Sequence, residues 1–205
     1  SRREFLYAAG AAAATAALPA RLAAGAARKT RYAIVGTGHR GSGMWGAEAL
    51  KRHGDTLELV ALCDVNTQRA EAANVLMGTK APVYADLDRM LDAVKVDRIA
   101  VCTVDSTHSA VIARALDRGV DVVTEKPMVT ELDQCRAIFE AERRSRRKVA
   151  MAFNYRYSPK LERVWSLLRT SGLGKVTSID FSWYLDVFHG ADYFRRWHRL
   201  KSQGG

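Results

Sequence analysis

One short glycine pattern constrains this chain more than any other feature. The pattern Gly36-Thr37-Gly38-His39-Arg40-Gly41 directly follows an apolar run at residues 32–35. In a strand–turn–helix unit, the first glycine permits a tight turn, the second lets phosphates approach the backbone, and the third lets helix and strand pack closely. Free N–H groups at the start of the helix favour an anion. The pattern therefore predicts a strand, a phosphate-binding turn and a helix.

A carboxylate at the end of the next apolar run sharpens this prediction. Asp64 follows Gly41 at about the twenty-residue spacing of an acid that binds the adenosine ribose of a dinucleotide. Such an acid repels a 2′-phosphate, so we expect NAD rather than NADP. The alternative is that Asp64 only helps to start the helix after it. The candidate cofactor-binding residues from this region are Gly36, Gly38, His39, Arg40, Gly41 and Asp64.

The body of the chain alternates short apolar runs with longer helical patterns. Strands are expected at 32–35, 57–63, 83–84, 98–103, 120–124 and 149–153. Helices are expected from the glycine turn to His53 and at 66–77, 86–94 and 108–118, with a long one starting at Thr130, where Asp133 forms a variant capping box. Apolar strands alternating with helices indicate a parallel sheet covered on both faces. The fold class is therefore α/β, a Rossmann-type doubly wound parallel sheet.

The pattern changes after residue 153. A helix is expected at 159–170 and a long alternating strand at 176–184, followed by an aromatic and basic tail that contributes no element able to close a domain. We expect residues 27–153 to form the dinucleotide-binding domain. Residues 154–205 would be the incomplete start of a second, α+β open-sheet domain.

The first 26 residues have the form of an export signal. The segment begins Ser1-Arg2-Arg3-Glu4-Phe5-Leu6, continues with an alanine-rich apolar run, and offers a small-residue cleavage site near Ala26. It resembles a twin-arginine signal peptide, which implies a periplasmic or secreted protein without a membrane span in its mature form. The alternative is an alanine-rich helix that belongs to the fold. The absence of a starting Met leads us to expect an incomplete chain.

The charge and the cysteines exclude two other classes of protein. The net charge of +10 could indicate nucleic-acid binding, but no matching motif is present, and the densest basic patch (residues 143–148) ends a predicted helix. We interpret this patch as a solvated helix end. Cys63, Cys102 and Cys135 have no metal-ligand spacing, so no metal site is expected and we interpret the first two as buried free thiols.

A second motif, Glu125-Lys126-Pro127, follows the fifth predicted strand. Ligands of open parallel sheets lie at the carboxyl ends of the strands, where this tripeptide falls. A lysine there can bind a substrate hydroxyl or take its proton as a hydride leaves the carbon. Glu125 could hold the lysine in position. The alternative is a salt-bridged turn without a chemical role.

Together, the glycine turn, Asp64, Cys102-Thr103 leading to His108, and the Glu-Lys-Pro motif resemble the Gfo/Idh/MocA family of oxidoreductases. The resemblance implies an NAD(P)-dependent oxidoreductase that acts on a sugar, polyol or glycoside, with Lys126 as the catalytic residue. It adds Thr103, His108, Glu125 and Lys126 to the cofactor-binding candidates. It also implies a homo-oligomer when the protein is full length.

Two departures from the family pattern stand out. Thr103-Val104-Asp105-Ser106 replaces the common Thr-Pro-Asn after the fourth strand. An Asp/His segment that supplies further catalytic groups would begin where the chain stops, at Gly204-Gly205. We therefore expect this chain alone to bind NAD without turnover.

Two other functions would use the same residues differently. A glycosidase or lyase could oxidise a sugar carbon transiently and retain its NAD. A sensor could bind the dinucleotide without any catalysis, in which case Lys126 would be dispensable.

Overall fold

The central feature of the protein is a single sheet of parallel strands. The computed structural model describes residues 28–204 except 171 and 173, so the predicted leader at 1–26 lies outside the described residues. The strands are β1 (Thr30–Val35), β2 (Leu57–Cys63), β3 (Val83–Tyr84), β4 (Arg98–Val101), β5 (Asp121–Thr124) and β6 (Val149–Met151). Their order is β3-β2-β1-β4-β5-β6, and every neighbouring pair is parallel. The predicted doubly wound sheet is confirmed, and its strand order reverses between β1 and β4.

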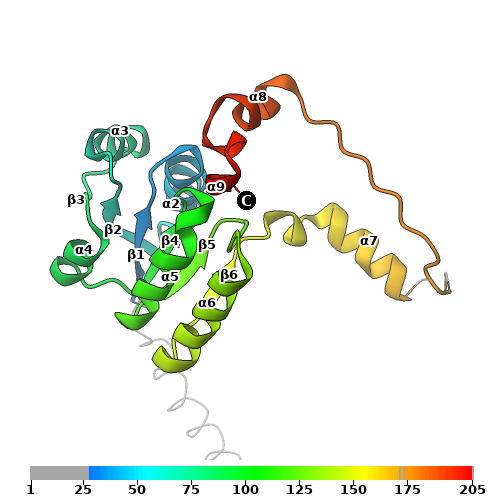
Figure 1. Cartoon of the computed structure of the whole chain (residues 1–205), viewed down its shortest axis with the longest axis horizontal. Coiled ribbons are helices and arrows are strands. Elements are labelled where there is room, and N and C mark those ends of the chain that lie inside the picture. Colours follow the sequence, from blue (N-terminus) through cyan, green and yellow to red (C-terminus); the bar gives the residue numbers. More distant parts are fainter. Residues whose placement is uncertain (1–27, 171, 173, 205) are drawn as a thin grey trace, which may run out of the picture.

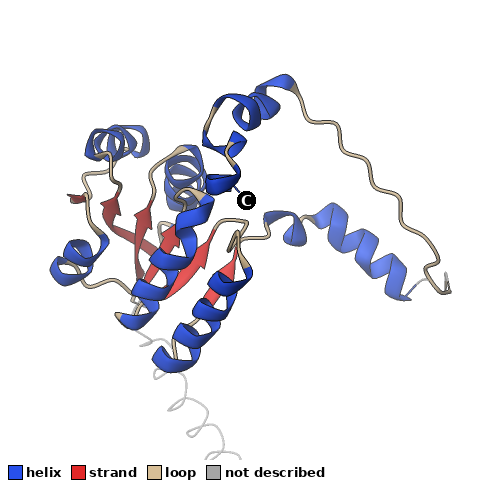
Figure 2. Ribbon diagram, in the orientation of Figure 1, coloured by secondary structure: helices blue, strands red, loops and turns tan. Residues whose placement is uncertain are grey.

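Helices cover both faces of this sheet (Figures 1 and 2). One face carries the π-helix η1 (Arg40–Glu48), α2 (Ala49–His53) and α3 (Thr67–Met77). The other face carries α4 (Leu87–Ala93), α5 (His108–Asp117) and α6 (Leu132–Ser145). Alternate residues of β1 serve the two cores: Ile34 packs toward α3, whereas Ala33 and Val35 pack toward α4 and α5. A central strand buried on both sides must be apolar throughout.

The starts of the helices show how far local sequence fixes their bounds. The Asn66 side chain accepts a hydrogen bond from the Arg69 N–H, and Asp86 caps α4 in the same way. The predicted capping box at Thr130 and Asp133 is wrong by one residue. The cap of α6 is Glu131, and Gln134 completes the box. Gln134 also accepts from the Thr130 N–H, which draws Thr130 into the turn before the helix.

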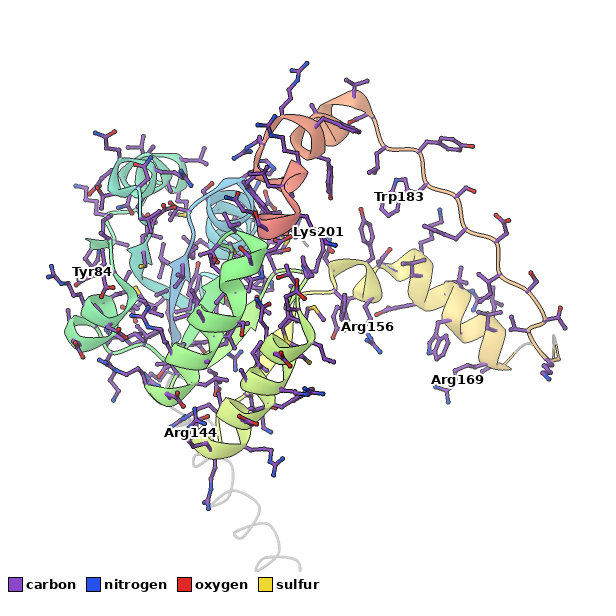
Figure 3. The ribbon with its side chains drawn as sticks, in the orientation of Figure 1. Tyr84, Arg144, Arg156, Arg169, Trp183 and Lys201 are labelled. Atoms are coloured by element: carbon purple, nitrogen blue, oxygen red, sulfur yellow. The ribbon has the colours of Figure 1, made fainter. Side chains whose placement is uncertain are left out.

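Two predicted strands end early and a third does not form. β4 stops at Val101 and β6 at Met151, two residues before their expected ends. Residues 176–184 run extended but do not form a β-strand, because no strand among the described residues pairs with them. Trp183 projects from this extended segment in Figure 3. The division between the two domains at residue 153, and the homo-oligomer, stay predictions.

The C-terminal part forms helices that the sequence did not predict. After η3 (Asn154–Tyr157) and α7 (Pro159–Thr170), the chain continues into α8 (Val187–Arg195), η4 (Trp197–Arg199) and α9 (Lys201–Gly204). α7 extends away from the sheet, whereas α8, η4 and α9 lie back at the edge where the strands end (Figure 1). α9 packs on η2 (Asp105–Thr107), the short helix after β4. None of the described helices is long and apolar enough to cross a lipid bilayer.

The basic patch at residues 143–148 lies at the solvated end of α6. Arg144 donates to both carboxylate oxygens of Asp117 on α5, at 2.7 and 2.8 Å. The Lys148 amine lies 3.9 Å from the Glu142 carboxylate. Figure 3 places Arg144 at the end of α6 that is remote from the carboxyl ends of the strands. These charges thus contribute to helix–helix and surface contacts.

The close packing of the first helix on β1 generates a prediction about stability. A Cβ atom at Gly41 would lie 2.0 Å from the Gly36 carbonyl oxygen. Gly41→Ala should therefore lower the free energy of unfolding by roughly 1–3 kcal/mol or more, the usual cost of overpacking. Gly43→Ala is the matched control, because a Cβ there meets nothing within 4 Å. Equal melting temperatures for the two variants in a thermal unfolding experiment would contradict this account.

Candidate dinucleotide-binding site

The glycine turn lies at the carboxyl edge, the edge of the sheet where the parallel strands end. Gly36 has φ 92°, and a Cβ there would lie 2.6 Å from the Cys102 carbonyl. Only glycine fits this conformation and this approach. Gly41 is equally enclosed, whereas a Cβ at Gly38 would meet nothing within 4 Å. Two glycines of the pattern thus pack the turn, and the middle one leaves open space over the backbone.

Asp64 holds the turn from the neighbouring strand. Its Oδ2 atom accepts hydrogen bonds from the backbone N–H and the hydroxyl of Thr37, both at 2.8 Å. Its Oδ1 atom accepts from the Asn66 N–H at 2.9 Å. A buried carboxylate needs such partners, because leaving it unpaired costs several kcal/mol. Asp64 therefore organises the turn, and its predicted contact with a ribose stays a prediction.

A cavity of about 290 Å³ opens beside the turn. Its polar side is formed by the turn and the first residues of the following helix: Thr37, Gly38, His39 and Ser42. Its opposite side comes from α3 and the C-terminal segment: Arg69, Ala72, Ala73, Leu76 and Arg196. The cavity thus combines backbone, cationic and apolar surfaces, as a nucleotide requires.

The charges around the turn are arranged with the cations outward. The Arg40 side chain is 42% exposed, while that of its partner Glu125 is 7% exposed. The Arg69 side chain is 51% exposed, and its guanidinium lies 3.7 Å from the carboxylate of Asp64, whose side chain is 3% exposed. Each pair therefore buries its anion and presents its cation to solvent. Together with the open backbone at Gly38, this arrangement fits the pyrophosphate of a dinucleotide.

The imidazole of His108 is fully buried and holds the loop after β4 in position. Its Nδ1 atom lies 2.8 Å from the Pro127 carbonyl oxygen, and its Nε2 atom lies 3.1 Å from the Thr103 carbonyl oxygen. The ring therefore bridges the loops that follow β4 and β5. The ring nitrogen that carries the proton donates to the carbonyl oxygen beside it. The predicted cofactor contacts of Thr103 and His108 stay predictions.

The Glu125-Lys126-Pro127 segment leaves β5 at the same edge. The Glu125 Oε1 atom accepts from Arg40 Nη2 at 2.8 Å and from the Trp45 indole N–H at 2.9 Å. The Glu125 carboxylate thus faces η1, and its predicted role in holding Lys126 in position stays a prediction. Lys126 itself is exposed, and the Lys126–Pro127 peptide is cis.

Asp105 lies between the C-terminal helices and Lys126, since α9 packs on its helix η2 and its carboxyl interacts electrostatically with both His198 and Lys126. Burial raises the pKa of the Asp105 carboxyl, while the nearby His108, His198 and Lys126 oppose that rise. His198 stacks on Trp197, with ring centroids 3.6 Å apart, and lies 5.0 Å from the Tyr193 ring. The Asp105 carboxyl is therefore within electrostatic reach of both Lys126 and the His198 ring, which the aromatic side chains contact.

The thiols at this edge are free and protected. Burial is the main cause that raises the pKa of Cys63 to about 11, and burial also raises the pKa of Cys102. Cys63 is buried, and Cys102 is partly buried under the glycine turn. Across the described residues, no cluster of three or more His, Cys, Asp or Glu side chains could hold a metal ion.

The fold and this edge define a dinucleotide-binding Rossmann domain, and comparison with known families specifies which kind. Residues 30–153, more than half of the chain, match the model of the Gfo/Idh/MocA oxidoreductase family, described as having an NAD-binding Rossmann fold. The chain belongs to this family. The family and the Rossmann-type fold class predicted from the sequence are thereby confirmed.

Two curated relatives illustrate the similarity. The chain is 35% identical to YteT of Bacillus subtilis, which is assigned as an oxidoreductase, over 84% of this chain and 41% of that protein. It is 30% identical to the D-apiose dehydrogenase of Paraburkholderia graminis, over 71% of this chain and 39% of that protein. The chain thus spans less than half the length of these curated relatives.

A solved structure shows the same fold with its ligands. The WlbA dehydrogenase of Bordetella pertussis, in complex with NADH and UDP-GlcNAcA, superposes with a TM-score of 0.67 at 26% identity. The match covers 72% of this chain and 44% of that one.

Three residues at the site escaped sequence reasoning: Trp45, Asp105 as a partner of Lys126, and Arg196. Trp45 and Glu125 are 80 positions apart, and no local pattern links them. The departure from the family pattern at Asp105 suggests a residue that faces the cofactor, but no local pattern links it to Lys126. Arg196 lay in a basic and aromatic tail whose helices were not predicted. In each case the missing information was the tertiary contact.

The contrast between the glycines yields a binding prediction. Gly38→Ala should weaken NAD binding about tenfold or more, which corresponds to ~1.4 kcal/mol, because the methyl group fills the space that phosphates approach. The melting temperature should stay unchanged, since nothing lies within 4 Å. Calorimetric titration measures the affinity, and Gly43→Ala is the control. Unaltered NAD affinity would show that the phosphates bind elsewhere.

Proposed function

We propose that the intact protein is an NAD-dependent oxidoreductase that transfers hydride between NAD and a hydroxyl-bearing carbon of a sugar, polyol or glycoside. The observation that carries this proposal is the exposed Lys126 amine, which leaves β5 at the carboxyl edge that also holds the glycine turn. The names of the relatives support the substrate class. D-apiose and inositol dehydrogenases are among them.

The residues divide the work between binding and proton transfer. When bound, NAD supplies the hydride acceptor. The glycine turn, Arg40 and Arg69 would hold its phosphates, and the adenosine ribose would face Asp64. Lys126 would take the proton of the substrate hydroxyl as that carbon is oxidised, and would return it in the reverse direction. Asp105 lies within electrostatic reach of Lys126 and would stabilise the charged form of the lysine after it takes the proton.

The C-terminal helices support a sugar-sized substrate. Tyr193 and Trp197, whose rings contact His198, belong to the helices that lie at the carboxyl edge, and aromatic rings can pack on the apolar faces of a sugar (Figure 1). Lys201 on α9 lies at the same edge (Figure 3). These groups would complete a pocket over Lys126.

The role of Lys126 is directly testable in the intact protein. Lys126→Ala should lower turnover about 10²–10⁴-fold, the usual contribution of a general acid or base, while NAD affinity stays nearly unchanged. Lys126→Arg keeps the charge but cannot exchange the proton, so it should be equally impaired. Lys51→Ala, at an exposed position on α2, is the control. Rates and NAD affinities are measured by steady-state kinetics and calorimetry.

The same experiment separates the alternative functions. Wild-type turnover of Lys126→Ala would refute the role of Lys126, whereas NAD binding without turnover in the intact wild-type protein would favour a dinucleotide sensor. A glycosidase or lyase that retains its NAD would consume substrate without accumulating the near-ultraviolet absorbance of reduced nicotinamide. Accumulation of that absorbance with substrate is the outcome expected here.

We also propose that the protein is exported through the twin-arginine route to the periplasm or beyond. The support is the paired arginine before the apolar leader, Ser1-Arg2-Arg3-Glu4-Phe5-Leu6. This route carries folded proteins, which suits a fold that must capture NAD in the cytoplasm.

Replacing Arg2 and Arg3 with Lys should retain the protein in the cytoplasm, because the route reads the arginine pair itself and not only its charge. Cell fractionation and immunoblotting measure the distribution. A variant that replaces Arg21 with Lys is the matched control and should be exported normally. Normal export of the double variant would contradict the assignment.

A further inference from the structure

Glu125 connects two parts of the carboxyl edge that are far apart in the sequence. Its Oε1 atom is shared by Arg40, in the glycine turn, and by Trp45, one turn further along η1. Its own backbone N–H donates to the Val101 carbonyl at 2.9 Å. The residue is therefore fixed to β4 through its main chain and to η1 through its side chain.

Lys126 lies between two anchored residues. On one side is the Glu125 side chain with its partners on η1. On the other side is the Pro127 carbonyl, which contacts the buried ring of His108. Only the Lys126 side chain is exposed at this point of the chain. The direction in which the lysine leaves the sheet thus depends on contacts made by both of its neighbours.

Arg40 can serve two anions at once. A guanidinium carries five N–H donors in a planar fork, and one nitrogen of Arg40 is used by Glu125. The rest of the side chain reaches solvent at the glycine turn, where phosphates would bind. A phosphate on the outer edge of Arg40 would hold its inner edge against the Glu125 carboxylate.

We propose that Glu125 is a positioning residue that couples phosphate binding at the glycine turn to the placement of Lys126. This inference rests on the proposed function. Binding of the cofactor phosphates would immobilise Arg40, which would tighten the Arg40–Glu125–Trp45 contacts and order the segment that carries the lysine. The substrate-binding lysine would then be in place only when the cofactor is.

ADP is the appropriate probe, because it carries two phosphates but neither the second ribose nor the nicotinamide that would reach Lys126. Hydrogen exchange followed by mass spectrometry measures the order of residues 125–130. In the wild-type chain, ADP should slow exchange of this segment about fivefold or more, the lower end of ordinary coupling between two sites. Exchange in α4, on the opposite face of the sheet, should not change.

Two variants test the route of the coupling. Glu125→Gln keeps the shape and an acceptor oxygen but loses the charge, and Arg40→Lys keeps the charge but loses the planar fork. Glu125→Gln should still bind ADP by calorimetry, whereas Arg40→Lys, which changes a phosphate-binding residue, is compared at saturating ADP. In both, the slowing in residues 125–130 should fall below about twofold, outside the usual range of coupling. Glu140→Gln, an exposed position on α6, is the matched control and should behave as wild type.

Each outcome decides a different point. If Glu125 only stabilised the fold, residues 125–130 of Glu125→Gln would exchange faster both with and without ADP. ADP would still slow their exchange as in wild type, and this result would overturn the inference. Slowing of the same size in Arg40→Lys would also overturn it. Failure of ADP and NAD to bind the wild-type chain would instead refute the proposed dinucleotide site.

Discussion

The rest of the site depends on the close approach of Gly36 to the backbone that leaves β4. The Gly36 N–H donates to the Cys63 carbonyl, and the Cys102 N–H donates to the Val35 carbonyl, so the end of β1 is held between its two neighbours. No side chain fits between Gly36 and Cys102. Because the turn is pressed onto β4, the helix after it starts directly above the carboxyl edge. A wider turn would carry Arg40 and Trp45 away from β5.

Two buried carboxylates fix this turn from opposite sides. Asp64 comes from the end of β2 and binds Thr37, while Glu125 comes from the end of β5 and binds Arg40 and Trp45. Charge-assisted hydrogen bonds of this kind are stronger than neutral ones, and their loss leaves a buried charge without a partner. Both carboxylates therefore have structural roles, in addition to the ligand contacts that the sequence motifs predict for them.

The sequence predicts the scaffold well because the scaffold follows from local patterns. The continuous apolar runs, the caps Asn66 and Asp86 and the helix at Pro159–Thr170 all reflect interactions within a few residues. The segment at 176–184 shows the limit of that reasoning. The alternation of apolar and polar residues in this segment predicts a strand, but a strand forms only where a second strand pairs with it. Likewise, the partners of Glu125 lie 80 and 85 positions away, and no periodicity reveals them.

The distribution of charge explains how a basic chain can be selective for one anionic ligand. At the end of α6, Arg144 shares its guanidinium with Asp117, whose carboxylate is itself exposed, so the pair presents both charges to solvent. At the glycine turn, the carboxylates of Asp64 and Glu125 are buried and only the cations face outward. An exposed pair is screened and attracts little, whereas outward cations beside free backbone N–H groups create a local positive potential. The positive potential at the glycine turn therefore arises because the anionic partner of each ion pair is buried. The net charge of the chain does not determine it.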